Sequence, residues 1–106
     1  MKLVISPTIR IGAVKHKVKF DDVLLEHDDL RGSYRVKDEI IRLASGRSPE
    51  QTWMVLIHEV LHICSNESGA DSDENGIRGT ATLLAQATLS MGIEPDFSRI
   101  LGGKTK

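Results

Sequence analysis

The feature of the sequence that most limits its fold is an apolar run, residues 53–64, into which His58, Glu59 and His62 are set. An apolar run of this length with a helix start signal before it predicts a helix that is buried against the rest of the chain. Histidine and glutamate side chains lose hydration in such a helix, and this loss costs free energy unless a partner or a bound ion satisfies them. The fold must therefore place a polar partner beside these three side chains.

The helix is predicted to span residues 49–64. It begins at 48–51, Ser-Pro-Glu-Gln, where serine is a typical N-cap, proline is favoured at the first helical position and glutamine can complete a capping box. A second helix is expected from near Asp73, because apolar residues recur at helical spacing as far as Met91, and Gly92 ends it. The second half of the chain therefore reads as two helices.

The first half reads as strands separated by turn residues. The predicted strands are residues 3–5, 13–20, 34–36 and 39–43. The last two are expected to form a hairpin, and a short helical turn is expected near the C-terminus, over 96–101. Strands followed by helices, in a chain long enough for one core, predict a single α+β domain over residues 1–106 with a small, mostly antiparallel sheet.

Composition excludes several classes of function. The 14 basic and 15 acidic residues give a net charge of -1, which provides no electrostatic footprint for nucleic acid or an anionic membrane. One cysteine cannot form an intramolecular disulfide, and no segment is long and apolar enough for a signal peptide or a membrane span. The sequence therefore predicts a cytoplasmic protein without nucleic-acid or membrane partners.

Charge is nevertheless unevenly distributed near the N-terminus. Residues 1–20 carry only basic charges and residues 21–30 only acidic ones. Blocks of like charge usually face water, so we interpret the first as the solvent face of a strand and the second as an acidic loop. A partner-binding patch is the alternative.

The segment His58-Glu59-Val60-Leu61-His62 has the HExxH pattern. At about 100° per residue the two histidines lie about 40° apart on one helix face, where both imidazoles can bind the same ion, with the glutamate at the flank. In 106 residues with four histidines and seven glutamates, roughly 0.01 such matches are expected by chance. The pattern therefore favours a zinc site over two hydrogen-bonded core histidines.

A catalytic zinc site takes three protein ligands and leaves a fourth position for water, so a third ligand is needed. The third histidine of the metzincin pattern is absent, because serine stands at both diagnostic positions after the motif, and a carboxylate remains. Glu74, expected in the first turn of the second helix, is the favoured ligand. Asp71 and Asp73 are the alternatives, and Glu67 lies too close to the end of the first helix.

These residues resemble a known family. The helix start at 48–51, the segment 56–62 (Leu-Ile-His-Glu-Val-Leu-His) and Glu74 followed by Ile77 are similar to the small gluzincin-type zinc metallopeptidases, the minigluzincins, whose core is shared by the ImmA/IrrE relatives. The likeness covers about residues 30–92. It implies a zincin-like fold, in which a small sheet precedes a zinc-binding helix and a second, C-terminal helix.

The resemblance also implies an activity. It assigns His58, His62 and Glu74 as ligands of Zn²⁺ and Glu59 as the general base that activates water to hydrolyse a peptide bond. The partner is then a peptide or protein substrate in an extended conformation. Residues 39–43 are either the sheet edge that receives this substrate or an ordinary internal strand. The residue that would stabilise the oxyanion stays open, since Tyr34 is the only tyrosine and its reach is not readable from sequence.

Other side chains are not expected to take part. Cys64 points away from the metal face of its helix and is interpreted as a packed core thiol. Met54 and Met91 are expected in the core. His16 and His27 have no ligand spacing to the motif.

Two other classes of function compete with the peptidase. One is a zinc-containing binding or regulatory module of the same fold that cuts nothing, and the other is a structural protein whose histidines bind no metal. The retained Glu59 argues against the first, because a purely structural zinc site needs no base and fills its fourth position with another ligand. Metal content separates the second from the rest.

Overall fold

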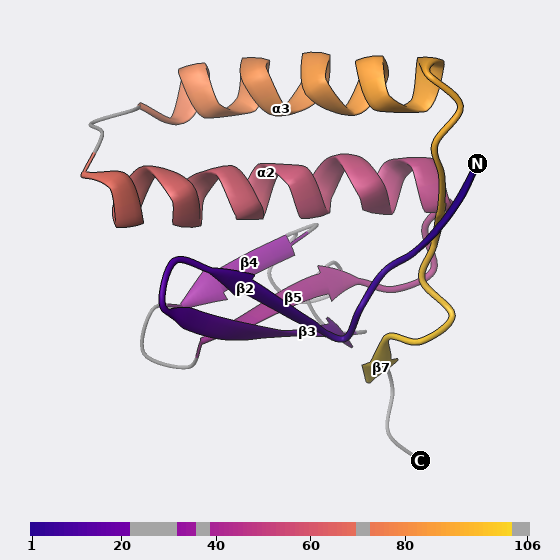
Figure 1. Cartoon of the computed structure of the whole chain (residues 1–106), viewed down its shortest axis with the longest axis horizontal. Coiled ribbons are helices and arrows are strands. Elements are labelled where there is room, and N and C mark those ends of the chain that lie inside the picture. Colours follow the sequence, from indigo (N-terminus) through magenta and orange to yellow (C-terminus); the bar gives the residue numbers. More distant parts are fainter. Residues whose placement is uncertain (22–31, 36–38, 70–72, 103–106) are drawn as a thin grey trace.

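The computed structural model describes residues 1–21, 32–35, 39–69 and 73–102 (Figure 1). Its elements are β1 (Lys2–Val4), β2 (Thr8–Ile11), β3 (Val14–Asp21), β4 (Gly32–Arg35), β5 (Ile40–Ala44), α2 (Pro49–Ser68), α3 (Glu74–Ser90), β6 (Glu94–Asp96) and β7 (Leu101–Gly102). Helix α2 lies between the larger sheet and α3, so that the three stack as layers (Figure 1). The expected α+β architecture with two helices is confirmed.

The larger sheet is mixed rather than mostly antiparallel as predicted. Its strand order is β2-β3-β5-β4, and β7 also pairs with β3. The β2–β3 and β4–β5 pairs are antiparallel, whereas β3 runs parallel to both β5 and β7. The prediction was wrong because β5, the second strand of the β4–β5 hairpin, lies next to β3 and runs parallel to it, while β4 lies at the end of the strand order. A separate two-stranded sheet pairs β1 with β6 in parallel.

Individual strands follow the sequence pattern closely. The predicted hairpin forms, with Tyr34 opposite Ile41 in the register of β4 and β5. In β3 the lysines are exposed while His16 and Val18 are buried, as the period of two requires. Strand β2 was missed, and the tail forms two short strands around a turn rather than a helical turn. This turn is closed by the Ile100 N–H, which donates to the Phe97 carbonyl at 3.0 Å.

Both helices begin at the caps that the sequence indicates. Ser48 and Gln51 form a reciprocal capping box, with each side chain accepting a backbone N–H at 3.1 Å. At the start of α3, Asp73 accepts the N–H of Gly76 at 2.7 Å. Helix α2 extends one turn beyond the prediction and ends at Gly69, whose φ of 75° is left-handed.

The core lies between α2 and the sheet, and α3 packs on the other side of α2. Its large apolar side chains with the deepest burial are Val18, Ile41 and Leu43 from the sheet and Leu56 and Ile63 from α2. Full burial of each such side chain stabilises the fold by about 1.5–3 kcal/mol. This packing fixes the rotation of α2 and therefore the direction in which its remaining faces point.

Two further expectations concern buried and apolar residues. Met54 packs partly buried against the core, as expected. Met91 does not, because it caps the end of α3 with 75% of its surface exposed.

Within the described residues, neither helix is long and apolar enough to cross a bilayer.

Candidate metal centre

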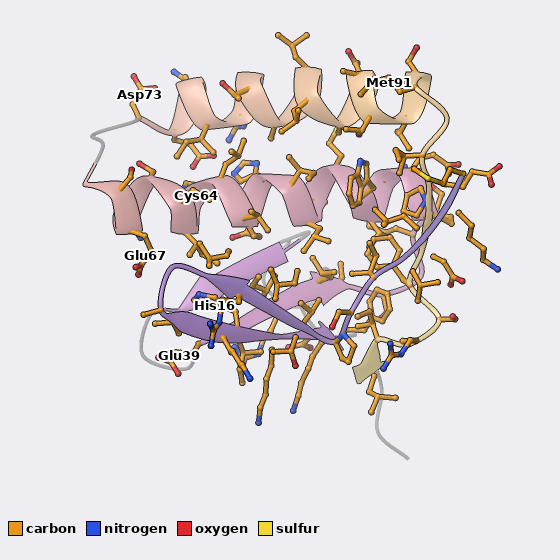
Figure 2. The ribbon with its side chains drawn as sticks, viewed as in Figure 1. His16, Glu39, Cys64, Glu67, Asp73 and Met91 are labelled. Carbon is orange, nitrogen blue, oxygen red and sulfur yellow. The ribbon has the colours of Figure 1, made fainter. Side chains whose placement is uncertain are left out.

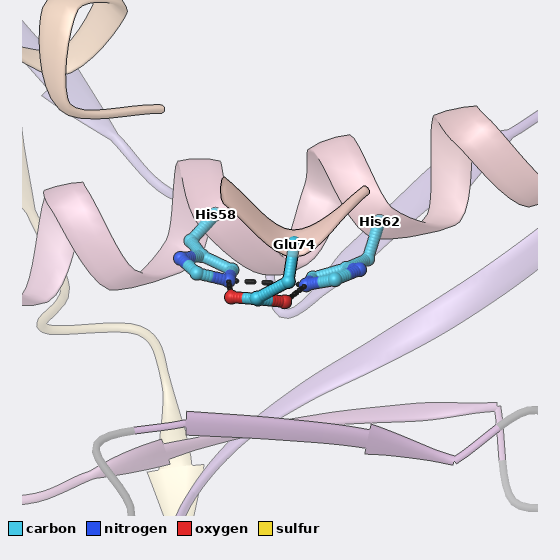
Figure 3. A group of neighbouring side chains, drawn as sticks. All are labelled: His58, His62 and Glu74. Atoms are coloured by element: carbon cyan, nitrogen blue, oxygen red, sulfur yellow. Dashed lines mark hydrogen bonds and ion pairs between the residues drawn. The ribbon is translucent and has the colours of Figure 1, made fainter. Parts of the chain in front are cut away.

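Three side chains from the two helices converge at one point (Figure 3). His58 and His62 project from successive turns of α2, and Glu74 is the first residue of α3. The Nε2 atoms of the two histidines are 3.0 Å apart. Glu74 reaches both, with Oε2 at 3.1 Å from His58 Nε2 and Oε1 at 2.8 Å from His62 Nε2. The structure therefore brings together the three residues that the sequence predicts as metal ligands.

The cap of α3 explains why Glu74 rather than a neighbour reaches the histidines. Asp73 uses its carboxylate to accept the N–H of Gly76, so its oxygen is directed along the helix start. Glu74 follows it as the first helical residue and points from α3 toward α2. Of the other candidates, Asp71 lies outside the described residues. Glu67 lies against the β2–β3 turn, where a Cβ added to Gly12 would be 3.0 Å from Glu67 Oε1.

The geometry fits a divalent metal ion. Four ligands at 2.0–2.1 Å around tetrahedral zinc are separated from one another by about 3.3 Å. The two imidazole nitrogens are 3.0 Å apart, close to this value, and each lies 2.8–3.1 Å from one of the two Glu74 oxygens. With one ligand atom from each residue, the three atoms lie within 4.8 Å of one another. Two imidazoles and a carboxylate are also a donor set that zinc accepts. In the part of the chain that the structure describes, no other group of three potential ligand side chains converges in this way.

The surroundings of His58 favour its neutral form. Burial lowers the pKa of His58 below its ordinary value, since it disfavours the charged imidazolium. The charge of Glu74 opposes this shift, while His62 and Arg78 reinforce it. The short contact between His58 and Glu74 is therefore better described as a hydrogen bond than as an ion pair at neutral pH. A neutral imidazole is also the form that coordinates a metal ion.

Glu59 lies on the flank of α2 that faces β4. Burial raises the pKa of Glu59, the charge of Glu74 raises it further, and His62 opposes both. A higher pKa brings this carboxylate closer to the pH at which it can both take and give a proton. Glu59 is not a member of the ligand cluster, so it is available for that role.

Gly32 allows β4 to approach α2 beside Glu59. A Cβ added at Gly32 would be 2.5 Å from Val55 Cγ1 and 3.5 Å from Glu59 Cγ, and the first of these contacts is impossible without displacement. The sequence marks Gly32 only as the start of a hairpin. Its role was missed because the signal is a tertiary contact, which no local pattern carries.

The sheet edge next to this site is β4. Residues 39–43 overlap β5, which lies between β3 and β4, so the internal-strand alternative is correct and the edge alternative is wrong. Strand β4 forms the end of the sheet path and packs against α2. The side chain of Tyr34 falls outside the described part of the chain.

The remaining candidates lie elsewhere (Figure 2). Cys64 is absent from the ligand cluster, as expected, but it is exposed rather than packed in the core. It borders a hollow of about 540 Å³ that α2 and α3 leave between Leu61 and Ile77. His16 is buried in β3, and His27 lies outside the described residues.

Arg78 is a further residue of the site that the sequence pattern did not single out. Its Nη2 atom lies 3.4 Å from Glu74 Oε2, one helical turn along α3. The four-residue spacing from Glu74 was the available signal, because residues at i and i+4 share a helix face.

Comparisons with known protein families, with curated proteins and with solved structures found no match for this chain. Function is therefore inferred from the geometry of these side chains and from the chemistry of their donor atoms.

Proposed function

We propose that this protein is a zinc-dependent metallopeptidase. The observation that carries the proposal is the convergence of His58, His62 and Glu74 within 3.1 Å of one another, next to a carboxylate, Glu59, whose pKa burial raises. Three protein ligands leave a fourth position for water, which is the arrangement of catalytic rather than structural zinc.

Each residue has a distinct role in this proposal. A zinc ion held by the three ligands would supply a Lewis acid that lowers the pKa of a bound water toward about 7 and polarises a carbonyl. Glu59 accepts a proton from the attacking water and passes it to the leaving amine. The half-buried position of Glu59 maintains its raised pKa.

We propose further that the substrate binds in an extended conformation along β4. Among the described residues, β4 pairs only with β5, so its other edge has backbone groups to offer to an added strand. The contact of Gly32 with Val55 and Glu59 places this edge against the helix that carries the proposed base. A peptide on this edge would therefore run beside the metal centre.

The test compares wild type with Glu59→Gln, because glutamine keeps the shape of the side chain and removes the proton acceptor. Zinc content is measured by mass spectrometry after purification without chelator, and hydrolysis is measured with fluorescently labelled casein. We expect one zinc ion per chain in both proteins and a loss of hydrolysis of about 10²-fold or more in Glu59→Gln. Cys64→Ser is the matched control on the same helix and keeps both properties.

The other outcomes assign the protein to another class. Equal hydrolysis by wild type and Glu59→Gln removes Glu59 from the mechanism. Zinc binding without hydrolysis by the wild type identifies a non-catalytic binding or regulatory module. Absence of zinc from the folded wild type contradicts the metal centre itself.

A further inference from the structure

We propose that Arg78 binds a carboxylate group of the substrate beside the metal centre, so that the preferred substrates are acidic or carboxylate-terminated peptides. This inference rests on the proposed peptidase function, which it extends to a class of substrate. Arg78 has no role in the metal binding and proton transfer proposed above, so the function of its guanidinium group is open.

The position of Arg78 suits this role. It stands one turn after Glu74 on the same face of α3, and its side chain is 65% exposed. In the described part of the chain its one ion-pair partner is Glu74, through a single contact of 3.4 Å between Nη2 and Oε2. A guanidinium group has five N–H donors, so most of them remain available for a ligand that approaches from solvent.

The charge around the centre favours an anion. The positive charge of Arg78 lies directly beside a proposed ligand, because its Nη2 atom is 3.4 Å from Glu74 Oε2. Once a divalent cation shares the carboxylate of Glu74, the attraction between Glu74 and Arg78 weakens. The cation and the guanidinium then outweigh the charges of Glu74 and Glu59, and the site becomes net positive. Arginine binds carboxylates with two parallel hydrogen bonds, so a carboxylate is the group that fits best.

A peptide can supply a carboxylate from an acidic side chain or from its C-terminus, and the experiment separates these sources. The probe is a peptide that is amidated at its C-terminus and spans the bond cleaved in casein, or a casein peptide of the same length if the wild type cleaves none. One arm places Glu at each of two positions on either side of the central bond of this peptide, with Gln at the same position as the neutral control. The other arm compares the neutral peptide with its free C-terminal acid. Wild type, Arg78→Gln, Arg78→Lys and Arg99→Gln are measured by kcat/KM.

Binding is measured independently of turnover. The same peptides are titrated by calorimetry into the zinc-loaded Glu59→Gln protein, with and without Arg78→Gln. Zinc affinity is measured for every variant. Arg99 is the matched control, because Arg99→Gln removes the same charge from an exposed position between β6 and β7.

We expect wild type to prefer one of the carboxylate peptides about tenfold over its neutral partner, in kcat/KM and in affinity. Arg78→Gln removes this preference, so that carboxylate and neutral peptides differ by less than about twofold, whereas Arg78→Lys keeps part of it and Arg99→Gln keeps all of it. The proposal is overturned if wild type shows no preference, if Arg78→Gln retains it, or if Arg78→Gln weakens zinc binding and slows all peptides alike. Arg78-dependent binding of carboxylate peptides without any hydrolysis supports the anion site and contradicts the peptidase.

Discussion

The two ends of the α2–α3 pair are joined by polar contacts of opposite character. At one end the indole N–H of Trp53 donates to Thr88 Oγ1 at 2.8 Å, and the Thr88 hydroxyl lies against the carbonyls of Leu84 and Ala85. The hydrogen-bonding groups at this end therefore have their partners within the protein. At the other end, the Nε2 atoms of two imidazoles and the carboxylate oxygens of Glu74 converge, with contacts of 2.8–3.1 Å. The first end stabilises the helix pair by itself, whereas the second is the proposed metal centre, called the metal end below.

This comparison predicts its largest effect at the metal end. Glu74→Ala should weaken zinc binding by about 10²-fold or more, because two imidazoles lack the charge and the third bond of the carboxylate. The rise in Tm on adding zinc should shrink accordingly, since a 100-fold loss of affinity removes about 2.7 kcal/mol of ligand stabilisation. Thermal denaturation with and without zinc, together with competitive zinc titration, measures both.

Asp73→Asn is the control for Glu74→Ala. Asparagine keeps a capping oxygen for the Gly76 N–H while it removes the carboxylate charge, so α3 should still begin at the same residue. Zinc affinity should stay within about threefold of wild type. If Asp73→Asn loses zinc and Glu74→Ala does not, Asp73 is the ligand.

The opposite end should show a smaller effect, on stability rather than on metal binding. Thr88→Val keeps the shape of the side chain but leaves the Trp53 N–H without its acceptor, which costs about 1–2 kcal/mol. Chemical unfolding measures this loss of free energy, and Tm should fall by about 5–10 °C in thermal unfolding. Zinc affinity should change by less than about threefold. A loss of zinc binding as large as that of Glu74→Ala would show that the two ends are not independent.

The smallest effect concerns the carboxylate that is buried next to the metal end. The pKa of Glu59 is raised in the folded protein, so folding is favoured by its protonated form, and this contribution is lost as pH rises through the folded pKa. Metal-free Glu59→Gln should therefore have a higher Tm than metal-free wild type at pH 7. The difference should vanish below the ordinary carboxyl pKa of about 4.5. A Tm difference that does not depend on pH would contradict this origin.

Local signals accounted for much of the site. The HExxH spacing placed two histidines on one face, and the cap at Asp73 set the start of α3 so that Glu74 points back at them. Both are properties of short segments. The role of Gly32 depends on the approach of β4 to α2, and the role of Arg78 depends on where α3 packs. Neither is encoded in a window of a few residues.

The fold shows the same division between local and distant information. Helix caps and the β4–β5 hairpin were predictable because their partners are close in sequence. The parallel pairings were not, since strand patterns do not specify which distant strand lies alongside. Exposure also depends on distant packing, which is why Cys64 and Met91 read as core residues but lie at the surface.

The pairing of β1 with β6 ties the beginning of the chain to its far end. Met1 contacts Gly92 across 91 residues of sequence, and Lys2 lies opposite Glu94. Contacts between such distant segments close large loops and slow folding. During synthesis, β1 cannot form this pair until β6 has left the ribosome. The helix pair with the proposed ligands consists of consecutive elements and precedes β6 in the sequence, so the proposed metal centre can assemble before β1 and β6 pair.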